Sequence, residues 1–338
     1  QRITALDERL WQLVLPSSPL ETLSTGHLWT EGPAYFPTGD FLIWSDIPRG
    51  RMYQWVPDLG VRVLDHAANN CNGHTIDPAG RLLACEHLTR SVVRFELDGR
   101  RTVVADSFGG RRLNSPNDVI VASDGSVWFT DPPYGGQLYE GTPDAPGGPS
   151  NPEGRINNRI GQPPEIGEAK REMPHGVYRV APDGAVTRMI EETQVEDPNG
   201  LCFSPGFDRL YVASTGKGPG DTGAGGRGEI FVFDVAPDGA VSNGRLFSDC
   251  MVDGVKCAPD GLRCDVFGNL WASSNAGRVV GYSGVTCWAP DGRLLGRVRL
   301  PEVCGNICFG GPKRNVLFMA ASQSIYALPT ATQGAGFS

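Results

Sequence analysis

Six residues with oxygen-bearing side chains recur at one position of a repeated pattern in this 338-residue chain. They are Glu31, Asn72, Asn117, Asn199, Asp260 and Asn306. Carboxylate and amide oxygens without His or Cys suit a hard divalent cation, and two carboxylates balance a charge of +2. Turn chemistry is the alternative, because Asn and Asp favour turns before Gly, but Glu31 is not a turn former.

The elements that position these residues are six copies of one sequence unit. Each copy has a polar residue, an apolar run, a Gly/Asp/Pro turn, a second run with a polar end, and a third run. "NGHTIDPAGRLLACEH" from Asn72 and "NGLCFSPGFDRLYVAST" from Asn199 are two of them. Three or four strands per unit, at a period of about 40 to 50 residues, indicate propeller blades. A β-sandwich with generic DG turns is the alternative, but it does not require six copies in phase.

We therefore predict an all-β, six-bladed β-propeller with four-stranded blades around a central channel and a short N-terminal arm or helix. Residues 1–24 are the predicted arm, and residues 25–330 the single propeller domain. The Pro/Gly-rich segment 132–174 interrupts blade three, whose later strands are expected in "HGVYRVAPDGAVTRM" from His175. A loop of that length is typical of a lid, with disorder as the alternative.

Innermost strands line the channel of a propeller, so the six polar residues are expected to converge at one end. The second strand of each blade runs back to that end, and His74 points to the same side of its strand as Asn72. We therefore expect further contacts to substrate or to the ligand ring from Asn72, His74, Glu86, His87, Asp131 and Asn306. The alternative for each is a hydrogen-bonding role at a strand end. His27, His66 and His175 are expected to be structural.

Composition limits the function classes. The formal net charge of −8 argues against unaided nucleic-acid binding, and no apolar run approaches the length of a membrane helix. Nine cysteines cannot all pair, and their spacing fits no zinc site, so buried free thiols are expected, with one disulfide in an exported protein as the alternative. These features predict a cytoplasmic monomer or weak dimer, or a periplasmic protein if Gln1 follows a removed signal peptide.

Several ordered motifs resemble one family. "WTEGPAYF", "NSPNDVIV", "DPNGLCFS" and "PDGLRCDVFGNLWAS" are similar to the senescence-marker-protein/gluconolactonase/luciferin-regenerating-enzyme family. "NGHTIDPAGRLLACEH" and "SVWFTDPPYG" resemble its bacterial gluconolactonase branch. The resemblance runs from about residue 25 to residue 325 and implies a six-bladed propeller with one divalent metal in its channel.

By motif, the resemblance assigns the metal ligands to four of the six aligned positions. They are Glu31 in EGP, Asn117 in PND, Asn199 in PNG and Asp260 in PDG. Ca²⁺ fits best, with Zn²⁺, Mn²⁺ or Mg²⁺ as substitutes. One departure is Ser115, at the place where animal members carry an arginine that contacts sugar hydroxyls, so sugar preference does not carry over directly.

The reaction implied by the resemblance is hydrolysis of an aldonolactone ring to the hydroxy acid. A cation would act as Lewis acid, with Asp260 and Glu31 as the catalytic carboxylates and Asp260 as general base. Glu86 or His74 is the alternative base, because a ligating carboxylate is a weakened one. The rival functions are a phosphotriesterase-type hydrolase on the same metal and a non-catalytic, Ca²⁺-stabilised propeller that binds a ligand.

Overall fold

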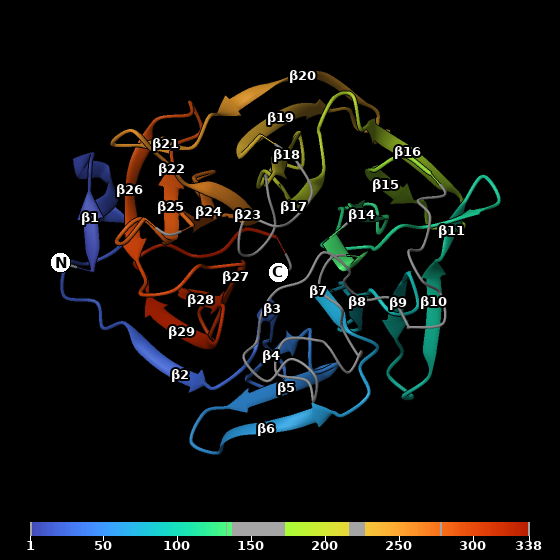
Figure 1. Cartoon of the computed structure of the whole chain (residues 1–338), viewed down its shortest axis with the longest axis horizontal. Helices are drawn as coiled ribbons and strands as arrows, with labels where there is room; N and C mark the ends of the chain where they lie inside the picture. The colour runs from blue at the N-terminus through green and yellow to red at the C-terminus, as the bar shows by residue number, and fades with distance from the viewer. Residues whose placement is uncertain (1, 133, 137–172, 216–226, 278, 337–338) are drawn as a thin grey trace.

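The computed structural model describes residues 2–132, 134–136, 173–215, 227–277 and 279–336. Within these residues, six antiparallel sheets of four or five strands are arranged around one axis (Figure 1). The predicted all-β, six-bladed propeller is confirmed. Most of the predicted 132–174 insertion lies outside the described residues.

Each of the first three blades is built from four consecutive strands of its own sheet. The strands of blade one are β3 (Thr30–Phe36), β4 (Phe41–Asp46), β5 (Arg51–Val56) and β6 (Gly60–Asp65). Those of blade two are β7 (Cys71–Ile76), β8 (Leu82–Glu86), β9 (Ser91–Phe95) and β10 (Arg101–Ala105). Those of blade three are β13 (Val119–Val121), β14 (Val127–Asp131), β15 (Gly176–Val180) and β16 (Val186–Glu191). The strands expected after His175 therefore belong to blade three, as predicted.

The last three blades follow the same order, and two of them receive strands from the N-terminal segment. Blade four contains β17 (Pro198–Phe203), β18 (Arg209–Ser214), β19 (Glu229–Val235) and β20 (Val241–Ser248). Blade five contains β23 (Ala258–Cys264), β24 (Leu270–Asn275), β25 (Gly284–Trp288), β26 (Leu294–Arg299) and an outer β1 (Ile3–Ala5). Blade six contains β27 (Asn306–Gly310), β28 (Val316–Ala321), β29 (Ser324–Pro329) and an outer β2 (Glu21–Thr25).

Short elements decorate these sheets. They are the hairpins β11 (Ser107–Phe108) with β12 (Arg111–Arg112) and β21 (Met251–Val252) with β22 (Val255–Lys256), and the 3₁₀ helices η1 (Glu8–Gln12) and η2 (Tyr134–Gly136). The predicted N-terminal helix corresponds to η1, which the Asp7 side chain caps by accepting a hydrogen bond from the Arg9 N–H.

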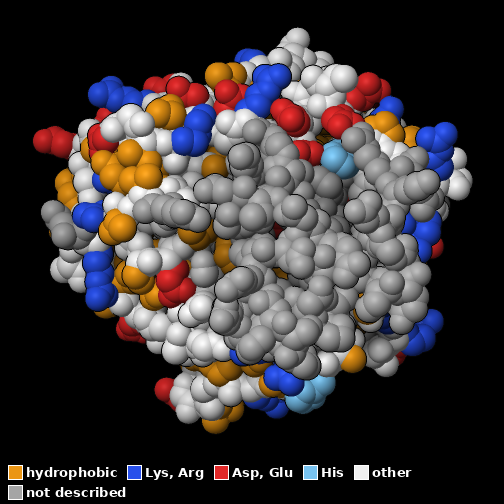
Figure 2. Space-filling view, in the orientation of Figure 1, with side chains coloured by type: hydrophobic (Ala, Val, Ile, Leu, Met, Phe, Trp, Pro, Cys, Tyr) orange, Lys and Arg blue, Asp and Glu red, His pale blue; other side chains and the backbone are white. Residues whose placement is uncertain are grey.

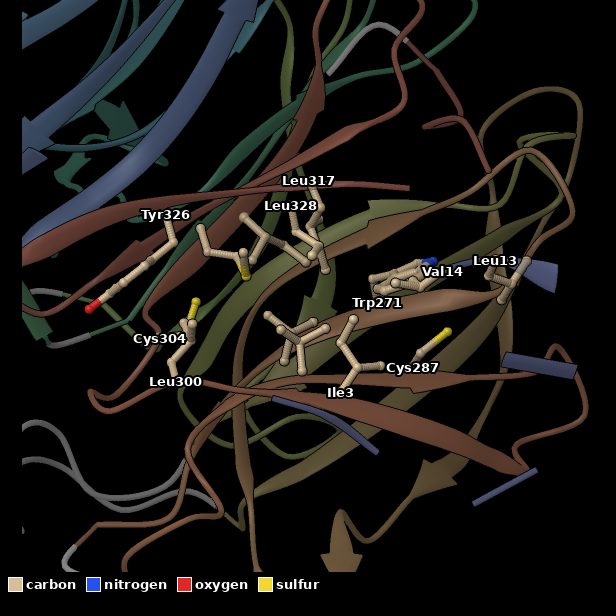
Figure 3. Close-up of a cluster of buried hydrophobic side chains, with 14 of the residues drawn as sticks. Ile3, Leu13, Val14, Trp271, Cys287, Leu300, Cys304, Leu317, Tyr326 and Leu328 are labelled. Atoms are coloured by element: carbon tan, nitrogen blue, oxygen red, sulfur yellow. The ribbon is translucent and has the colours of Figure 1, made fainter. Parts of the chain in front are cut away.

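The N-terminal segment closes the ring. Its strand β2 pairs antiparallel with β29, so blade six combines strands from both ends of the described chain. Figure 3 shows how Ile3, Leu13 and Val14 pack with Trp271, Leu317 and Leu328 in the core between blades five and six. This mixed core ties the segment to the propeller.

The charged surface and the free cysteines agree with what the composition predicts. Charged side chains of both signs lie around the rim of the face in Figure 2. All nine cysteines are free and buried, as predicted. Within the described part of the chain, no helix has the length and apolar character required to cross a bilayer.

Candidate active site at the centre of the ring

The six innermost strands form a closed circle. Neighbouring pairs contact each other all the way round, in the order β3, β7, β13, β17, β23, β27 and back to β3. Five of the six predicted polar residues lie at or near the start of these strands: Glu31, Asn72, Asn199, Asp260 and Asn306. Asn117 lies two residues before β13. The fold therefore brings residues up to 275 positions apart (31 to 306) to one end of the same circle.

Glycines after the polar residues allow this close approach. The Gly73 N–H donates to the Asn117 carbonyl oxygen of the next blade at 2.8 Å. A β-carbon on Gly200 would lie only 1.9 Å from the Asp260 carbonyl oxygen. The Asn-Gly pair in blade four therefore serves inter-blade packing, because a side chain at Gly200 would collide with the backbone of blade five.

The alignment of Asn306 is wrong by one residue. Gly261 donates to the Gly305 carbonyl oxygen at 2.8 Å, just as Gly73 does to Asn117, so Gly305 occupies the predicted ring position in blade six. Backbone pairing is uninterrupted from Asn306 through β27. In blades four and five, by contrast, the pairing of the innermost strand is interrupted by a bulge where a glycine follows the polar residue. Asn306 therefore corresponds to Asp118 and not to Asn117.

The one-residue shift creates a space for Glu31. A β-carbon on Gly305 would lie 2.3 Å from Glu31 Oε1, so the carboxylate fits because Gly305 has no side chain. The Gly32 N–H donates to Glu31 Oε2 at 3.0 Å. The side-chain amide of Asn306 also hydrogen-bonds the carboxylate. Asn306 thus contacts the ring by supporting Glu31.

Negative charge accumulates at this end of the circle. Burial raises the pKa of Glu31 well above its ordinary range, and the charge of Asp118 raises it further. Burial also raises the pKa of Asp260, with the charges of Glu31 and Asp118 adding to it. The Asp260 residue as a whole keeps partial exposure, but protein atoms surround its carboxylate. These carboxylates are close enough to repel one another, which is the arrangement that a cation stabilises.

Two amide oxygens in the ring lack hydrogen-bond partners. Asn199 Oδ1 and Asn72 Oδ1 are buried and accept no hydrogen bond within the described structure. A buried, unpaired carbonyl oxygen is costly, so such atoms require a ligand or a water. Asn117 is buried as well, with its backbone N–H bonded to Thr130.

The predicted histidines lie beside Asn72. His74 Nδ1 lies 2.7 Å from the Gly32 carbonyl oxygen, so Nδ1 carries the proton, and the buried Nε2 has no partner. Burial lowers the pKa of His74 to about 4, so the ring is neutral at pH 7. His87 Nε2 lies 3.4 Å from the Asn72 amide nitrogen.

Three other predicted residues hold loops together. The Glu86 carboxylate is bound by Asn69, Thr89 and Arg101. Asp131 accepts the N–H groups of Asn114 and Ser115 at 2.8 Å each, and burial raises its pKa to about 6.

The Ser115 hydroxyl donates to the Pro132 carbonyl oxygen and accepts the Gly135 N–H. Ser115 thus fixes the loop before Asn117 to the start of the blade-three insertion.

The sequence prediction missed a buried ion pair. Arg263 Nη1 lies 3.5 Å from Asp118 Oδ2, and both side chains are almost fully buried. Arg263 looks out of place in the apolar strand "LRCDVF", and Asp118 replaces the glycine that follows the ring residue in four other blades. Those two departures from the repeat were the available signals.

His175 also has a charged partner. Its Nδ1 lies 2.5 Å from Asp197 Oδ1, two residues before Asn199. Asp197 has a positive φ of 44°, a conformation that is uncommon for non-glycine residues but more accessible to Asp than to most. The pair joins the residue before β15 to the residue before β17, the strand that carries Asn199.

Among the described residues, no cluster of three or more His, Cys, Asp or Glu side chains has a metal-binding arrangement. The predicted ring has only two carboxylates, and amide oxygens complete it. A separate cavity of about 640 Å³ lies against the N-terminal segment and blades five and six, where Arg2, Arg299 and Tyr326 contribute to its wall. It contains none of the predicted site residues.

Comparison with known proteins supports one family. A model of the SMP-30/gluconolactonase/LRE-like region matches residues 29–323. The gluconolactonase of Zymomonas mobilis is 28% identical, over 98% of this chain and 87% of the relative. The solved structure of a Xanthomonas campestris gluconolactonase is 33% identical with a TM-score of 0.76, over 98% of this chain and 95% of the other.

The fold is also found at greater distance. Regucalcin from Agrobacterium tumefaciens, a calcium-binding protein, is 17% identical with a TM-score of 0.68, over 95% of this chain and 98% of the other. At that identity the likeness concerns the propeller fold alone. On the match over residues 29–323, this chain belongs to the SMP-30/gluconolactonase/LRE-like family.

Proposed function

We propose that this chain is a lactone hydrolase that opens an aldonolactone ring to the hydroxy acid, with one divalent cation, preferably Ca²⁺, at the centre of the propeller. The gluconolactonases of Zymomonas and Xanthomonas, which match nearly the full chain, carry the lactonase part of this proposal. The small-molecule substrate follows from the same relatives.

The cation part rests on the unpaired Asn199 Oδ1. This buried oxygen lies in a ring with Glu31 and Asp260, whose charges repel each other. The residues fit a hard cation: Glu31, Asn117, Asn199 and Asp260 would hold it through oxygen atoms, with two negative charges in total. When bound, the cation supplies a Lewis acid for the lactone carbonyl.

The residues of the chain supply proton transfer and orientation. Of the two carboxylate residues in the ring, Asp260 keeps partial exposure, whereas Glu31 is buried, so we assign Asp260 the general-base role toward a water molecule. Glu86 is a weaker candidate because Arg101 and Thr89 bind its carboxylate. His74 is a poor base because burial lowers its pKa to about 4. Asn306 and Gly305 keep Glu31 in place.

A pH-stat assay on a panel of aldonolactones tests the proposal. Wild type, chelated protein, chelated protein with Ca²⁺ restored, and Asn199→Ala are compared. We expect chelation and Asn199→Ala each to lower kcat/KM by roughly 100-fold or more, and Ca²⁺ to restore only the wild type. Asn269→Ala is the matched control, since this buried asparagine bonds Asp265 in a blade-five turn away from the ring.

Each rival function has its own signature in this assay. Full activity of the chelated protein would rule out the cation mechanism and leave the lactonase activity intact. Faster hydrolysis of an organophosphate than of any lactone would favour the phosphotriesterase. A rise in Tm on Ca²⁺ addition without turnover of any lactone would favour the non-catalytic propeller.

A further inference from the structure

The ion pair between Asp118 and Arg263 is a buried charged group that the proposed reaction does not use. Asp118 directly precedes β13 in blade three, and Arg263 lies in β23 of blade five, so the pair joins two blades that are not neighbours. The exposed fractions of the two side chains are 0% and 2%. Burying two charges this completely is expensive, which calls for a specific reason.

The hydrogen bonding of the pair is incomplete. Arg263 Nη1 donates to the Leu262 carbonyl oxygen at 2.6 Å, but Nε and Nη2 have no partner. Neither carboxylate oxygen of Asp118 accepts a hydrogen bond of good geometry within the described residues, although the backbone N–H groups of Val119 and Leu201 lie close enough to lower the pKa of this carboxyl. The pair is therefore held chiefly by the attraction between opposite charges at 3.5 Å, and not by a complete hydrogen-bond network.

The charges of Asp118 and Arg263 act on the carboxylates of the candidate ring. The negative charge of Asp118 raises the pKa of both Glu31 and Asp260, while the positive charge of Arg263 lowers that of Glu31. A β-carbon on Gly73 would lie 2.6 Å from Asp118 Oδ1, so the carboxylate packs tightly against blade two. Three carboxylates and one guanidinium thus share the centre of the propeller.

The charge balance suggests a role for Arg263. Without the guanidinium, Glu31, Asp118 and Asp260 would carry three negative charges, one more than a divalent cation balances. We propose that Arg263 is a positioning residue whose fixed positive charge neutralises Asp118, keeps that carboxylate out of the ligand set, and leaves the ring with the two charges of Glu31 and Asp260. The part that concerns the cation rests on the proposed function.

A double-mutant cycle tests this pairing without an activity assay. Arg263→Met, Asp118→Asn and the double variant are compared with wild type by thermal unfolding in chelator and by calorimetric Ca²⁺ titration. In chelator we expect Arg263→Met to lower Tm by about 5 °C or more, because it leaves a buried charge unpaired. Adding Asp118→Asn should recover most of that loss.

The Ca²⁺ titration separates charge from packing. Arg263→Met should bind Ca²⁺ at least roughly tenfold more tightly than wild type, and Asp118→Asn should bind it more weakly by a similar factor. The double variant should return close to wild type. Arg263→Lys keeps the charge and should retain a wild-type affinity even if its Tm falls.

Arg297→Met is the matched control. Arg297 is a second buried arginine of blade five, on β26, and its partner Asp253 is half exposed. This variant should lower Tm without changing Ca²⁺ affinity, and Asp118→Asn should not rescue it.

Two outcomes are distinguishable. If Asp118→Asn fails to recover the Tm of Arg263→Met in chelator, the pairing role is wrong, whatever Ca²⁺ does. If the cycle behaves as expected in chelator but wild type binds no Ca²⁺, the charge pair stands, while the cation part of both the inference and the proposed function fails.

Discussion

At the scale of single residues, the site depends on what is missing as much as on what is present. Gly305 has no side chain, and the Glu31 carboxylate occupies the space that a β-carbon would fill. At Asn199, in contrast, a side-chain oxygen is present but is buried without a hydrogen-bond partner. The ring therefore contains a carboxylate that fits because Gly305 has no side chain, and an amide oxygen that has no hydrogen-bond partner.

Gly305→Ala should disturb the ring without unfolding the protein. Its new methyl group would lie 2.3 Å from Glu31 Oε1, so the carboxylate must move. We expect Ca²⁺ affinity to fall by roughly tenfold or more, because ligand position determines cation affinity. Isothermal titration calorimetry measures this change.

Gly206→Ala is the matched control, because the nearest atom to its added methyl group, Asp208 Oδ1, lies at 3.4 Å. It should leave Ca²⁺ affinity unchanged. Equal affinities for Gly305→Ala and wild type would mean that Glu31 is not a ligand.

At the scale of elements, the N-terminal segment supplies strands to two blades of the propeller. Strand β2 completes blade six, β1 adds an outer strand to blade five, and η1 lies between them in sequence. Blade six supplies Gly305 and Asn306, the two residues that shape the surroundings of Glu31. Packing at the outer edge of this blade therefore supports the position of a ring residue.

Leu10→Ala should destabilise the protein by about 2–5 kcal/mol. Leu10 lies in η1 with an exposed fraction of 1%, in the core shared with blades five and six. Removing a buried leucine side chain loses apolar contacts and leaves a cavity. Chemical denaturation followed by tryptophan fluorescence measures the free energy of unfolding.

Leu6→Ala is the comparison for this variant, because Leu6 is 47% exposed in the same segment. It should cost less than about 0.5 kcal/mol. Similar losses for the two variants would show that the segment does not belong to the core.

At the scale of the whole molecule, the propeller concentrates charge where its blades meet. Burial raises the pKa values of Glu31, Asp118 and Asp260 above their ordinary range. A carboxyl group whose pKa is raised by folding binds its proton more tightly in the folded state. Its contribution to stability is present at low pH and declines as pH rises above the unfolded pKa of about 4.

Chelated wild type should therefore lose stability as pH rises from about 5 to about 8. We expect Glu31→Gln to reduce this loss by on the order of 1–3 kcal/mol, because the amide does not ionise. Saturating Ca²⁺ should also flatten the wild-type profile. Denaturant unfolding across this pH range measures the difference between variants, and identical slopes for Glu31→Gln and wild type would contradict the charge assignment.

The sequence by itself determined the architecture and most of the ring. Six in-phase copies predicted six blades because every copy needs the same strands and turns, and aligned copies placed Glu31, Asn72, Asn117, Asn199 and Asp260 at one end of the circle. Local pattern is enough for such predictions, since strand period and turn chemistry are properties of neighbouring residues.

Only the tertiary structure decided the register of blade six and the use of the strand-end residues. Gly305 occupies the predicted place of Asn306, and Glu86 and Asp131 bind loops. The Asp118–Arg263 pair was invisible for the same reason: its partners are 145 positions apart (118 to 263) in blades three and five. Electrostatic and steric contacts form between residues that are far apart in the sequence, so only the tertiary structure identifies them.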